Sequence, residues 1–453
     1  MVAEKDLRGS WLVARGSQLA ARNSQLAARG SGLGAEDSKL KTQNSELTTV
    51  MSIVVQKYGG SSVADVDKIR AVAARVMETS RAGHDVVVVV SAMGDTTDEL
   101  IALARKVSAN PERRELDMLL SVGERISMAL LSIAIRELGG DAISFTGSQS
   151  GIITNDRHVD ARIIEVRPFR VQDELARGRV VVIAGYQGVS YAREVTTLGR
   201  GGSDTTAVAM AAALGADWCE ICSDVAGVYT ADPRVVPEAT RIPALSYEET
   251  QELAESGAKV LNAQAVEFAK KAGIAIYARA TAGALPGDDP SRDGTVVRKF
   301  APRLPGSVAG VASEGDILVL QAAGDVERLL TLLDNRGVVG KQLHATSVGG
   351  PGDGVALVIS RENLHNEEQV RRDIAAAFGA TARLIDTLGA VSVVGAGINA
   401  SYANVRRGTS ALREAGIAPE AMATSSFRIT WLVPRPQLND SVKTLHRSFL
   451  ENS

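Results

Sequence analysis

The sequence predicts an α/β fold with a mostly parallel sheet, followed by two smaller α+β units. From Met51 to about residue 280, continuous runs of β-branched residues alternate with helical patterns. Such alternation is typical of a parallel sheet whose two faces are covered by helices. A turn-rich stretch near residue 283 ends this pattern. After it, strand and helix patterns repeat twice in the approximate order βαββαβ.

The elements of the first part follow from hydrophobic periodicity. Strands are expected at 53–57, 86–94, 142–147, 180–185, 217–224 and 274–280. Helices are expected at about 63–77, 115–138, 203–216 and 265–273. Ligands of such sheets bind beyond the carboxyl ends of the strands. The loops that follow the strands are therefore the place to look for a site.

Composition excludes several classes of protein. The chain has 453 residues, enough for two to four domains, and 45% of them are hydrophobic. The net charge of -3 gives no basic surface for nucleic acid or membrane. No run of 18 apolar residues occurs, so no membrane span is expected. Small molecules are the expected partners.

The two cysteines form a C-x-x-C pair, Cys219 and Cys222. This spacing occurs in redox and metal sites, but here it lies in a strand-like run without a second pair or a nearby histidine. We interpret both as buried core residues. The low cysteine content suits a reducing cytoplasm.

Residues 1–50 carry a seven-residue repeat, with serine at 10, 17, 24, 31, 38 and 45 and leucine at 12, 19, 26, 33, 40 and 47. A coiled coil needs a second apolar position, but glycine, asparagine and aspartate precede each leucine by three residues. An organelle transit segment is disfavoured because Arg15, Arg22 and Arg29 share nearly the same helical face as the leucines. We expect a disordered or weakly helical extension outside the chemistry, with Met51 as an alternative start.

The first candidate site is the segment "VVQKYGGSSVADVDKIR", residues 54–70. Lys57 ends a strand, and Gly59, Gly60 and Ser61 form a turn before a helix. Glycines allow close approach of a ligand, and a helix start offers free N–H groups and a positive dipole. This arrangement favours a phosphate site. The alternative is a plain strand-to-helix turn with a surface lysine.

Further loops carry matching chemistry. "SAMGDTTDE" follows the second strand, "SVGERIS" contains Glu124, and "TTLGRGGSDTTA" contains Arg200, Ser203 and Asp204. An arginine can hold a carboxylate through two hydrogen bonds, and Glu124 could face an ammonium group. The combination fits transfer of phosphate to an amino acid. Taken singly, Glu124 could be a solvated helix residue and Asp204 a first-turn helix acid.

These motifs resemble those of the aspartokinases, members of the amino-acid kinase superfamily. "KYGGSS", "SAMGDTTDE", "GERIS", "FTGSQSGI", "TTLGRGGSDTTA", "SDVAGVYTADPR" and "GAKVL" occur in the family's order. The resemblance implies an amino-acid kinase three-layer sandwich at 51–300, an ACT domain at 305–386 and a second at 387–453. It implies transfer of the ATP γ-phosphoryl to the side-chain carboxylate of L-aspartate. Mg²⁺ is expected with ATP, without dedicated protein ligands.

The resemblance also implies residue roles. Lys57 and Asp204 match catalytic positions, with Lys57 stabilising charge on the transferring phosphoryl. Thr97, Glu124, Arg200 and Ser203 match aspartate contacts, with Glu124 at the ammonium and Arg200 at the α-carboxylate. ATP contacts are implied for Lys57, Gly59, Gly60, Ser61, Ser223, Asp224, Tyr229, Arg234 and Lys259.

The chain departs from the family pattern at several positions. Ala226 replaces a frequent aspartate, and Asn262-Ala263 replaces histidine-proline, both near the nucleotide. In the ACT region, Lys341 stands where relatives carry an acid, "QAAG" replaces the turn "DKPG", and 423–427 read Ala-Thr-Ser-Ser-Phe instead of "STSEI". We therefore expect weakened feedback control by lysine and threonine in a homo-oligomer joined through its ACT domains.

Two alternatives remain open on the sequence. One is a kinase of the same superfamily that acts on another acid, such as glutamate. The other is a non-catalytic amino-acid sensor. The product of an aspartokinase could enter lysine, threonine and methionine synthesis, or a dedicated secondary pathway.

Overall fold

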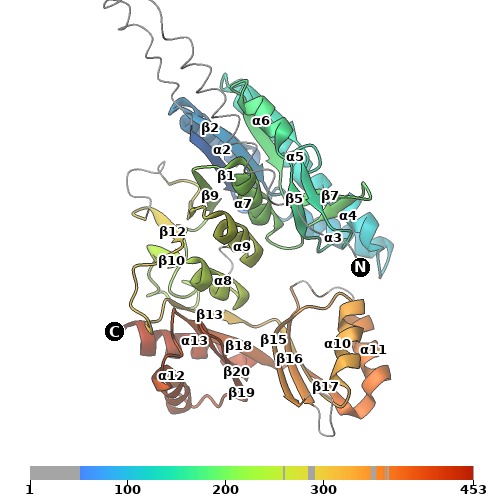
Figure 1. Ribbon diagram of the computed structural model, residues 1–453, viewed down its shortest axis with the longest axis vertical. Coiled ribbons are helices and arrows are strands. Elements are labelled where there is room, and N and C mark those ends of the chain that lie inside the picture. The colour runs from blue at the N-terminus through green and yellow to red at the C-terminus, as the bar shows by residue number, and fades with distance from the viewer. Residues whose placement is uncertain are drawn as a thin grey trace, which may run out of the picture. The chain divides into compact units, whose positions relative to one another are not determined.

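The computed structural model describes residues 52–258, 261–283, 291–347, 354–362, 364 and 367–451. The predicted N-terminal extension, Met51 and Lys259 lie outside these residues. Within them, the predicted α/β class with two appended α+β units is confirmed (Figure 1).

The main sheet has eight strands. Seven neighbouring pairs hold it together, and all are parallel except β11 with β12. Its order is β10 (Ala244–Ser246), β12 (Gly294–Arg298), β11 (Ile276–Ala280), β9 (Trp218–Ser223), β1 (Ser52–Tyr58), β2 (His84–Val90), β6 (Val180–Ala184) and β3 (Ala142–Phe145). The carboxyl ends of β1, β2, β6 and β9 therefore meet at one edge, where the candidate loops begin.

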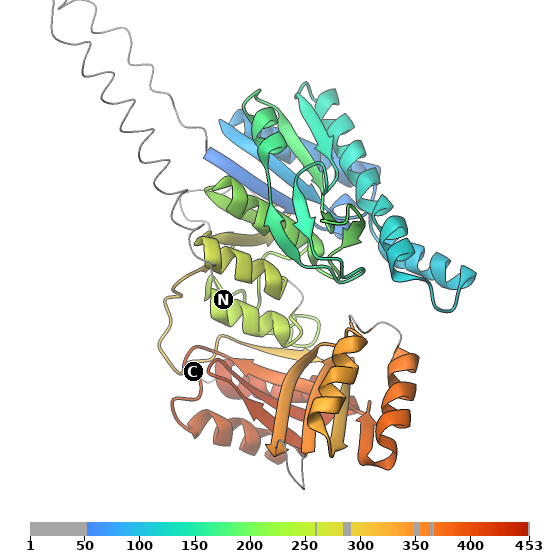
Figure 2. The same cartoon turned by 45° about the vertical axis from the view of Figure 1, so that its right-hand side comes forward.

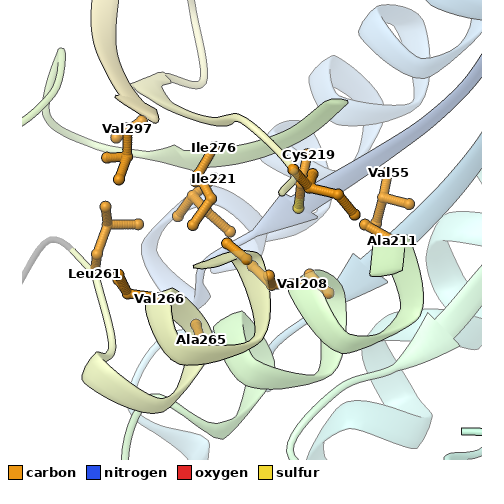
Figure 3. Packing of buried hydrophobic residues seen from close by; sticks show 14 of the residues in the cluster. Val55, Val208, Ala211, Cys219, Ile221, Leu261, Ala265, Val266, Ile276 and Val297 are labelled. Atoms are coloured by element: carbon orange, nitrogen blue, oxygen red, sulfur yellow. The ribbon is translucent and has the colours of Figure 1, made fainter. Parts of the chain in front are cut away.

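Helices cover both faces of this sheet, which makes three layers. One face packs against α2 (Val66–Arg81) and α5 (Val122–Glu137), and the other against α7 (Gly202–Leu214), α8 (Tyr247–Glu255) and α9 (Ala263–Ala272). Figure 3 shows the second of these layers, where Val208 and Ala211 of α7 lie under Cys219 and Ile221 of β9. The layers form because the strand side chains on both faces are predominantly apolar and buried.

The two cysteines of the C-x-x-C pair lie on opposite faces of the main sheet. Cys219 packs in the core on the α7 side of the sheet, and Cys222 packs in the core on the α2 side. Both thiols are fully buried, and burial raises the pKa of each. Side chains three positions apart in a strand point to opposite faces. The pair therefore cannot form a disulfide or share a metal ion, in agreement with the core interpretation.

Helix α4 (Arg113–Leu120) runs almost directly into α5, and the stretch Arg113–Glu137 is long and apolar enough to cross a membrane by length and composition. Half of its most apolar window is buried inside the structure. Leu131 and Ile135 lie in the core shared with α2 and the sheet. The buried apolar side chains of this stretch are therefore explained by packing in the protein core.

Several elements beside the main sheet were not predicted, and the strands among them have only three or four residues, which show no clear period. They include a second sheet ordered β5 (Ile163–Val166), β4 (Ile152–Thr154), β7 (Gln187–Ser190) and β8 (Val195–Thr197). Helices α3 (Thr96–Val107) and α6 (Phe169–Leu175) and the 3₁₀ turn η1 (Gly60–Val63) were also missed. The small sheet matters because β8 leads into the loop of Arg200.

The C-terminal part forms two four-stranded sheets, each with its helices on one face (Figures 1 and 2). The first contains β15 (Gly340–Ser347), β16 (Gly354–Ser360), β14 (Ile317–Ala323) and β17 (Ala382–Ile385), with α10 (Val326–Asn335), α11 (Glu367–Phe378) and η2 (Gly379–Thr381). The second contains β13 (Gly310–Glu314), β18 (Leu388–Val394), β20 (Arg428–Pro434) and β19 (Ala421–Thr424), with α12 (Ala403–Glu414), η3 (Arg435–Gln437), α13 (Leu438–His446) and the π-helical turn η4 (Arg447–Glu451).

Strand β13 differs from its predicted place. The sequence boundary put it at the start of a unit spanning 305–386, but it pairs antiparallel with β18, beyond that boundary. It completes the second unit, whose own segment supplies only βαββα. Pairing between strands about 80 residues apart cannot be read from local periodicity. The contiguous boundary at 386/387 is therefore wrong for this strand.

Candidate active site

The two glycine-rich turns after β1 and β2 are packed against each other. A Cβ on Gly60 would lie 2.9 Å from the carbonyl oxygen of Ala92 and 3.0 Å from that of Gly94, so only glycine fits there. The Gly94 N–H donates to the Gly60 carbonyl, and the Gly59 N–H donates to the carbonyl of Cys222 at the end of β9. The loops after β1, β2 and β9 therefore converge on one place.

Lys57 pairs with Asp204 at this place. Its Nζ lies 2.6 Å from the Asp204 Oδ1, and the two side chains are only 12% and 9% exposed. A Cβ on Gly59 would be 3.4 Å from the same Nζ, so the ammonium lies directly beside the turn. The lysine is held in position by α7, and it is not the surface lysine of the alternative interpretation.

The start of helix α2 does not lie at the glycine turn, where the sequence predicted that it would offer free N–H groups. A 3₁₀ turn, η1, intervenes, and α2 begins only at Val66. The Asp65 carboxylate caps α2 by accepting a hydrogen bond from the Lys68 N–H. The start of α2 thus has a donor already satisfied by its own acidic cap. Lys57 and the Gly59–Ser61 backbone therefore remain the candidate groups at this turn.

Glu124 is a buried acid in the first turn of α5. It is 2% exposed, and its Oε1 accepts a hydrogen bond of 3.1 Å from the Ala92 N–H. Its Oε2 is buried and has no hydrogen-bond partner in the part of the chain that the structure describes. Burial raises the pKa of Glu124 to about 7. A buried, unpaired carboxylate oxygen is costly unless a ligand satisfies it, so the solvated-helix alternative is wrong.

Arg200 lies in the loop between β8 and α7. Its side chain is 61% exposed, and the guanidinium reaches Asp98 of α3 at 3.4 Å. The next residue, Gly201, has φ 73° and caps α7 in the left-handed conformation. Thr97 is half-buried in the first turn of α3 beside Asp98. Arg200 is thus free to change partner when a ligand arrives, since the Asp98 contact is long and solvated.

Ser203 and Asn262 line the same turn. A Cβ on Gly185, at the end of β6, would lie 2.8 Å from the Ser203 Oγ, so this loop reaches the start of α7. The Asn262 side chain caps α9 and donates through Nδ2 to the Arg200 carbonyl at 3.0 Å. The departure Asn262 therefore supports the Arg200 turn, a role that sequence alone did not indicate.

Of the residues predicted to bind the nucleotide, the structure joins the Ser223 loop to the lysine turn, whereas Tyr229 and Arg234 make other contacts. The Ser223 carbonyl accepts from the N–H of Thr281, and the Thr281 hydroxyl lies 2.6 Å from that of Ser62 in η1, which joins the Ser223 loop to the lysine turn. Asp224 is exposed at the end of β9. Tyr229 forms an isolated bridge with Arg241, and the Arg234 guanidinium is 82% exposed and pairs with Asp232.

Tyr186 is a residue that sequence reasoning missed. It follows β6, has φ 67° and is half-buried. Burial raises the pKa of its phenol to about 12, and the charges of Glu124 and Arg200 act on the same group. Non-glycine residues in this conformation are strained and concentrate at functional sites. Its place immediately after a strand of the parallel sheet was the available signal.

The acidic side chains near the lysine turn are the available ligands for a metal ion. Across the described ranges, no group of three His, Cys, Asp or Glu side chains is arranged to hold an ion. Mg²⁺ usually keeps several waters and uses one or two carboxylates together with substrate phosphates. The carboxylates beside the lysine turn, Asp204 and Asp224, fit such an arrangement.

Comparison with known proteins agrees with this geometry. The model of the amino acid kinase family matches residues 52–278. The chain is 43% identical to the aspartokinase of Mycolicibacterium smegmatis and 42% identical to that of Corynebacterium glutamicum, in each case over 88% of this chain and 96% of the other. Its fold is similar to that of E. coli aspartokinase III in complex with aspartate and ADP, with a TM-score of 0.75 at 24% identity, over 87% of this chain and 99% of the other. The chain belongs to the aspartokinase family.

Proposed function

We propose that this protein transfers the γ-phosphoryl group of ATP to the side-chain carboxylate of L-aspartate, giving 4-phospho-L-aspartate and ADP. The observation that carries the proposal is the position of Lys57, held by Asp204 beside the Gly59–Gly60 turn and next to the loop that contacts Glu124. Phosphoryl transfer depends mainly on positioning and on electrostatic stabilisation of the transferring group. No side-chain nucleophile is needed, because the substrate carboxylate attacks.

The charged groups divide into a phosphate side and an amino-acid side. Lys57 and the N–H groups at Gly59, Gly60 and Ser61 stabilise negative charge on the transferring phosphoryl. Asp204 orients Lys57 through the 2.6 Å ion pair. Mg²⁺ bound to ATP supplies further charge neutralisation on the phosphate oxygens. Ser223, Asp224, Tyr229, Arg234 and Lys259 are assigned to the nucleotide.

On the amino-acid side, the unpaired Oε2 of Glu124 accepts a hydrogen bond from the α-ammonium group of aspartate. Arg200 leaves its long contact with Asp98 and donates two parallel hydrogen bonds to the α-carboxylate. Thr97 and Ser203 complete the contacts. With both α-substituents held, the side-chain carboxylate points toward the phosphate side, and its length selects aspartate over glutamate.

ADP release in the presence of aspartate, glutamate or N-acetylglutamate tests the substrate. Turnover should be restricted to aspartate, and hydroxylamine should trap the acyl phosphate as a hydroxamate. Faster turnover with another acid would assign the chain to a different substrate. The absence of turnover with every acid, in folded protein, would support a non-catalytic sensor.

The C-terminal sheets are proposed to be ACT domains that join copies of the chain in a cytoplasmic homo-oligomer. Their feedback response to lysine and threonine is proposed to be weak. Lys341 offers a specific reason, because its Nζ lies 2.6 Å from the Glu314 Oε2 and already satisfies that carboxylate. Light scattering of the purified protein, with and without the two amino acids, measures the assembly.

A further inference from the structure

Asp117 of α4 is a fully buried carboxylate that the proposed mechanism does not use. It accepts three hydrogen bonds from two other elements. His158 Nδ1, at 2.5 Å, and the Val159 N–H, at 3.0 Å, come from the β4–β5 loop. The Thr197 hydroxyl, at 2.6 Å, comes from the last residue of β8. A buried acid with this many donors fixes the elements that supply them.

The hydrogen bond to Thr197 leads toward the amino-acid side of the site. This bond packs helix α4 against strand β8, and both residues are fully buried. Along the chain, Asp117 lies seven residues before Glu124, and Thr197 lies three residues before Arg200. Glu124 and Arg200 are the two groups assigned to the substrate's ammonium and carboxylate.

The backbone connections lead to the same two groups. Helix α4, which carries Asp117, continues through Ser121 into α5 and Glu124. Strand β8, which carries Thr197, continues through Leu198 and Gly199 to Arg200. The contact between Asp117 and Thr197 thus sets the position of the Glu124 helix relative to the Arg200 loop.

We propose that Asp117 is a positioning residue for the aspartate site: it braces Glu124 and Arg200 at the separation that the α-ammonium and α-carboxylate require, without touching the substrate. This inference rests on the proposed function. Small displacements of binding groups weaken substrate binding strongly, because near-attack geometry is narrow. The brace acts on the amino-acid side only, since the ATP side is held by the separate contacts of β1, η1 and β9.

The chain offers a matched pair of threonines for the test. Thr196 and Thr197 are adjacent in β8 and both fully buried. The Thr196 hydroxyl bonds Thr154 at 2.6 Å, away from Asp117. Thr197→Val and Thr196→Val each remove one buried hydroxyl with little change of shape, although the loss of stability should be larger in Thr197→Val, whose hydroxyl bonds a carboxylate. Only the first interrupts the proposed brace.

We expect Thr197→Val to raise the aspartate KM about tenfold or more, the scale of one hydrogen bond to a charged group. The ATP KM should stay at the wild-type value, and Thr197→Ser, which keeps the hydroxyl, should restore the aspartate KM. Thr196→Val should keep the wild-type aspartate KM. Equal aspartate KM values in Thr196→Val and Thr197→Val would overturn the proposal and leave Asp117 a purely structural residue.

A double-mutant cycle isolates the contact. Asp117→Asn and Thr197→Val should each raise the aspartate KM, and the double variant should be no worse than the more severe single one. Additive effects would contradict the brace. If Asp117→Asn does not fold, the threonine series still decides. Failure of the proposed function is distinguishable, because it would appear as missing aspartate turnover in the wild-type protein before any variant is compared.

Discussion

Lys57 of β1 and Asp204 of α7 face each other across the carboxyl end of the sheet, with 2.6 Å between Nζ and Oδ1. The pair joins the first strand of the fold to a helix that begins almost 150 positions later in the chain. Because both side chains are largely buried, each holds the other in place. In the proposed function, this contact positions the strand-end lysine to act on the phosphoryl group.

Lys57→Met should lower kcat at least about 10²-fold, the scale of losing one preorganised electrostatic contact. The change leaves Asp204 buried without its partner, so thermal stability should also fall. The double variant with Asp204→Asn should recover the stability and not the turnover. Steady-state ADP release and thermal unfolding measure the two effects separately. Near-wild-type kcat in a folded Lys57→Met protein would remove Lys57 from the mechanism.

Arg200→Ala and Arg234→Ala should have reciprocal effects. Arg200→Ala should raise the aspartate KM by about tenfold or more and leave the ATP KM nearly unchanged, because it removes a charged hydrogen bond to the α-carboxylate. Arg234→Ala should raise the ATP KM alone. Each variant is the control for the other, since both guanidiniums are exposed and their loss does not disturb the core. The opposite pattern would exchange the two assignments.

Glu124 predicts a pH dependence of aspartate binding. Burial raises its pKa to about 7, and the substrate ammonium requires the ionised form. The aspartate KM, measured at saturating ATP, should therefore rise as the pH falls below about 7. Glu124→Gln should bind aspartate weakly at every pH and lose this dependence. A wild-type KM that is constant between pH 6 and pH 8 would contradict the assignment.

The same raised pKa predicts the sign of a stability effect. The folded state holds the Glu124 proton more tightly than the unfolded state between pH 4.5, the ordinary value, and about 7. The contribution of Glu124 to the free energy of unfolding is therefore fully present below 4.5 and is lost as the pH rises through about 7. Urea unfolding of wild type and Glu124→Gln across this range should show a difference that changes with pH in that direction.

Feedback inhibition should be weak. Lysine, threonine or both at low millimolar concentration should leave aspartate kinase activity nearly unchanged. An effector shifts an equilibrium only by its difference in affinity for the two states, and Lys341 already satisfies Glu314. Lys341→Ala should keep the basal rate, and any gain of lysine sensitivity in it would identify Glu314 as the released partner. Clear inhibition of the wild-type enzyme would show that the effector loops were aligned wrongly.

A chain beginning at Met51 should keep full activity, because the seven-residue repeat of residues 1–50 offers no apolar seam for packing. Specific activity and soluble yield of the shortened and full-length chains measure this. A loss of either on truncation would give the repeat a structural role.

Much of the fold was determined by the sequence itself. Six strands of the main sheet, β1, β2, β3, β6, β9 and β11, were predictable together with helices α2, α5, α7 and α9, because buried β-branched runs and helical periodicity are local properties of the chain. Lys57, Gly59 and Gly60 were recognisable for the same reason, since a charge and a flexible turn at a strand end lie within a few residues. Arg200 and Asp204 followed from a second turn of this kind.

The tertiary structure decided what depends on contacts between distant segments. Periodicity does not reveal that β13 completes the second C-terminal sheet, because strand pairing is set by packing across the whole unit. The role of Asp117 could not be predicted, because an acid in a helical pattern is expected to face solvent. Only the tertiary structure shows that β8 and the His158 loop bury it. The sequence likewise does not show that Glu124 has a buried, unpaired oxygen, because its burial depends on the distant loop of Ala92.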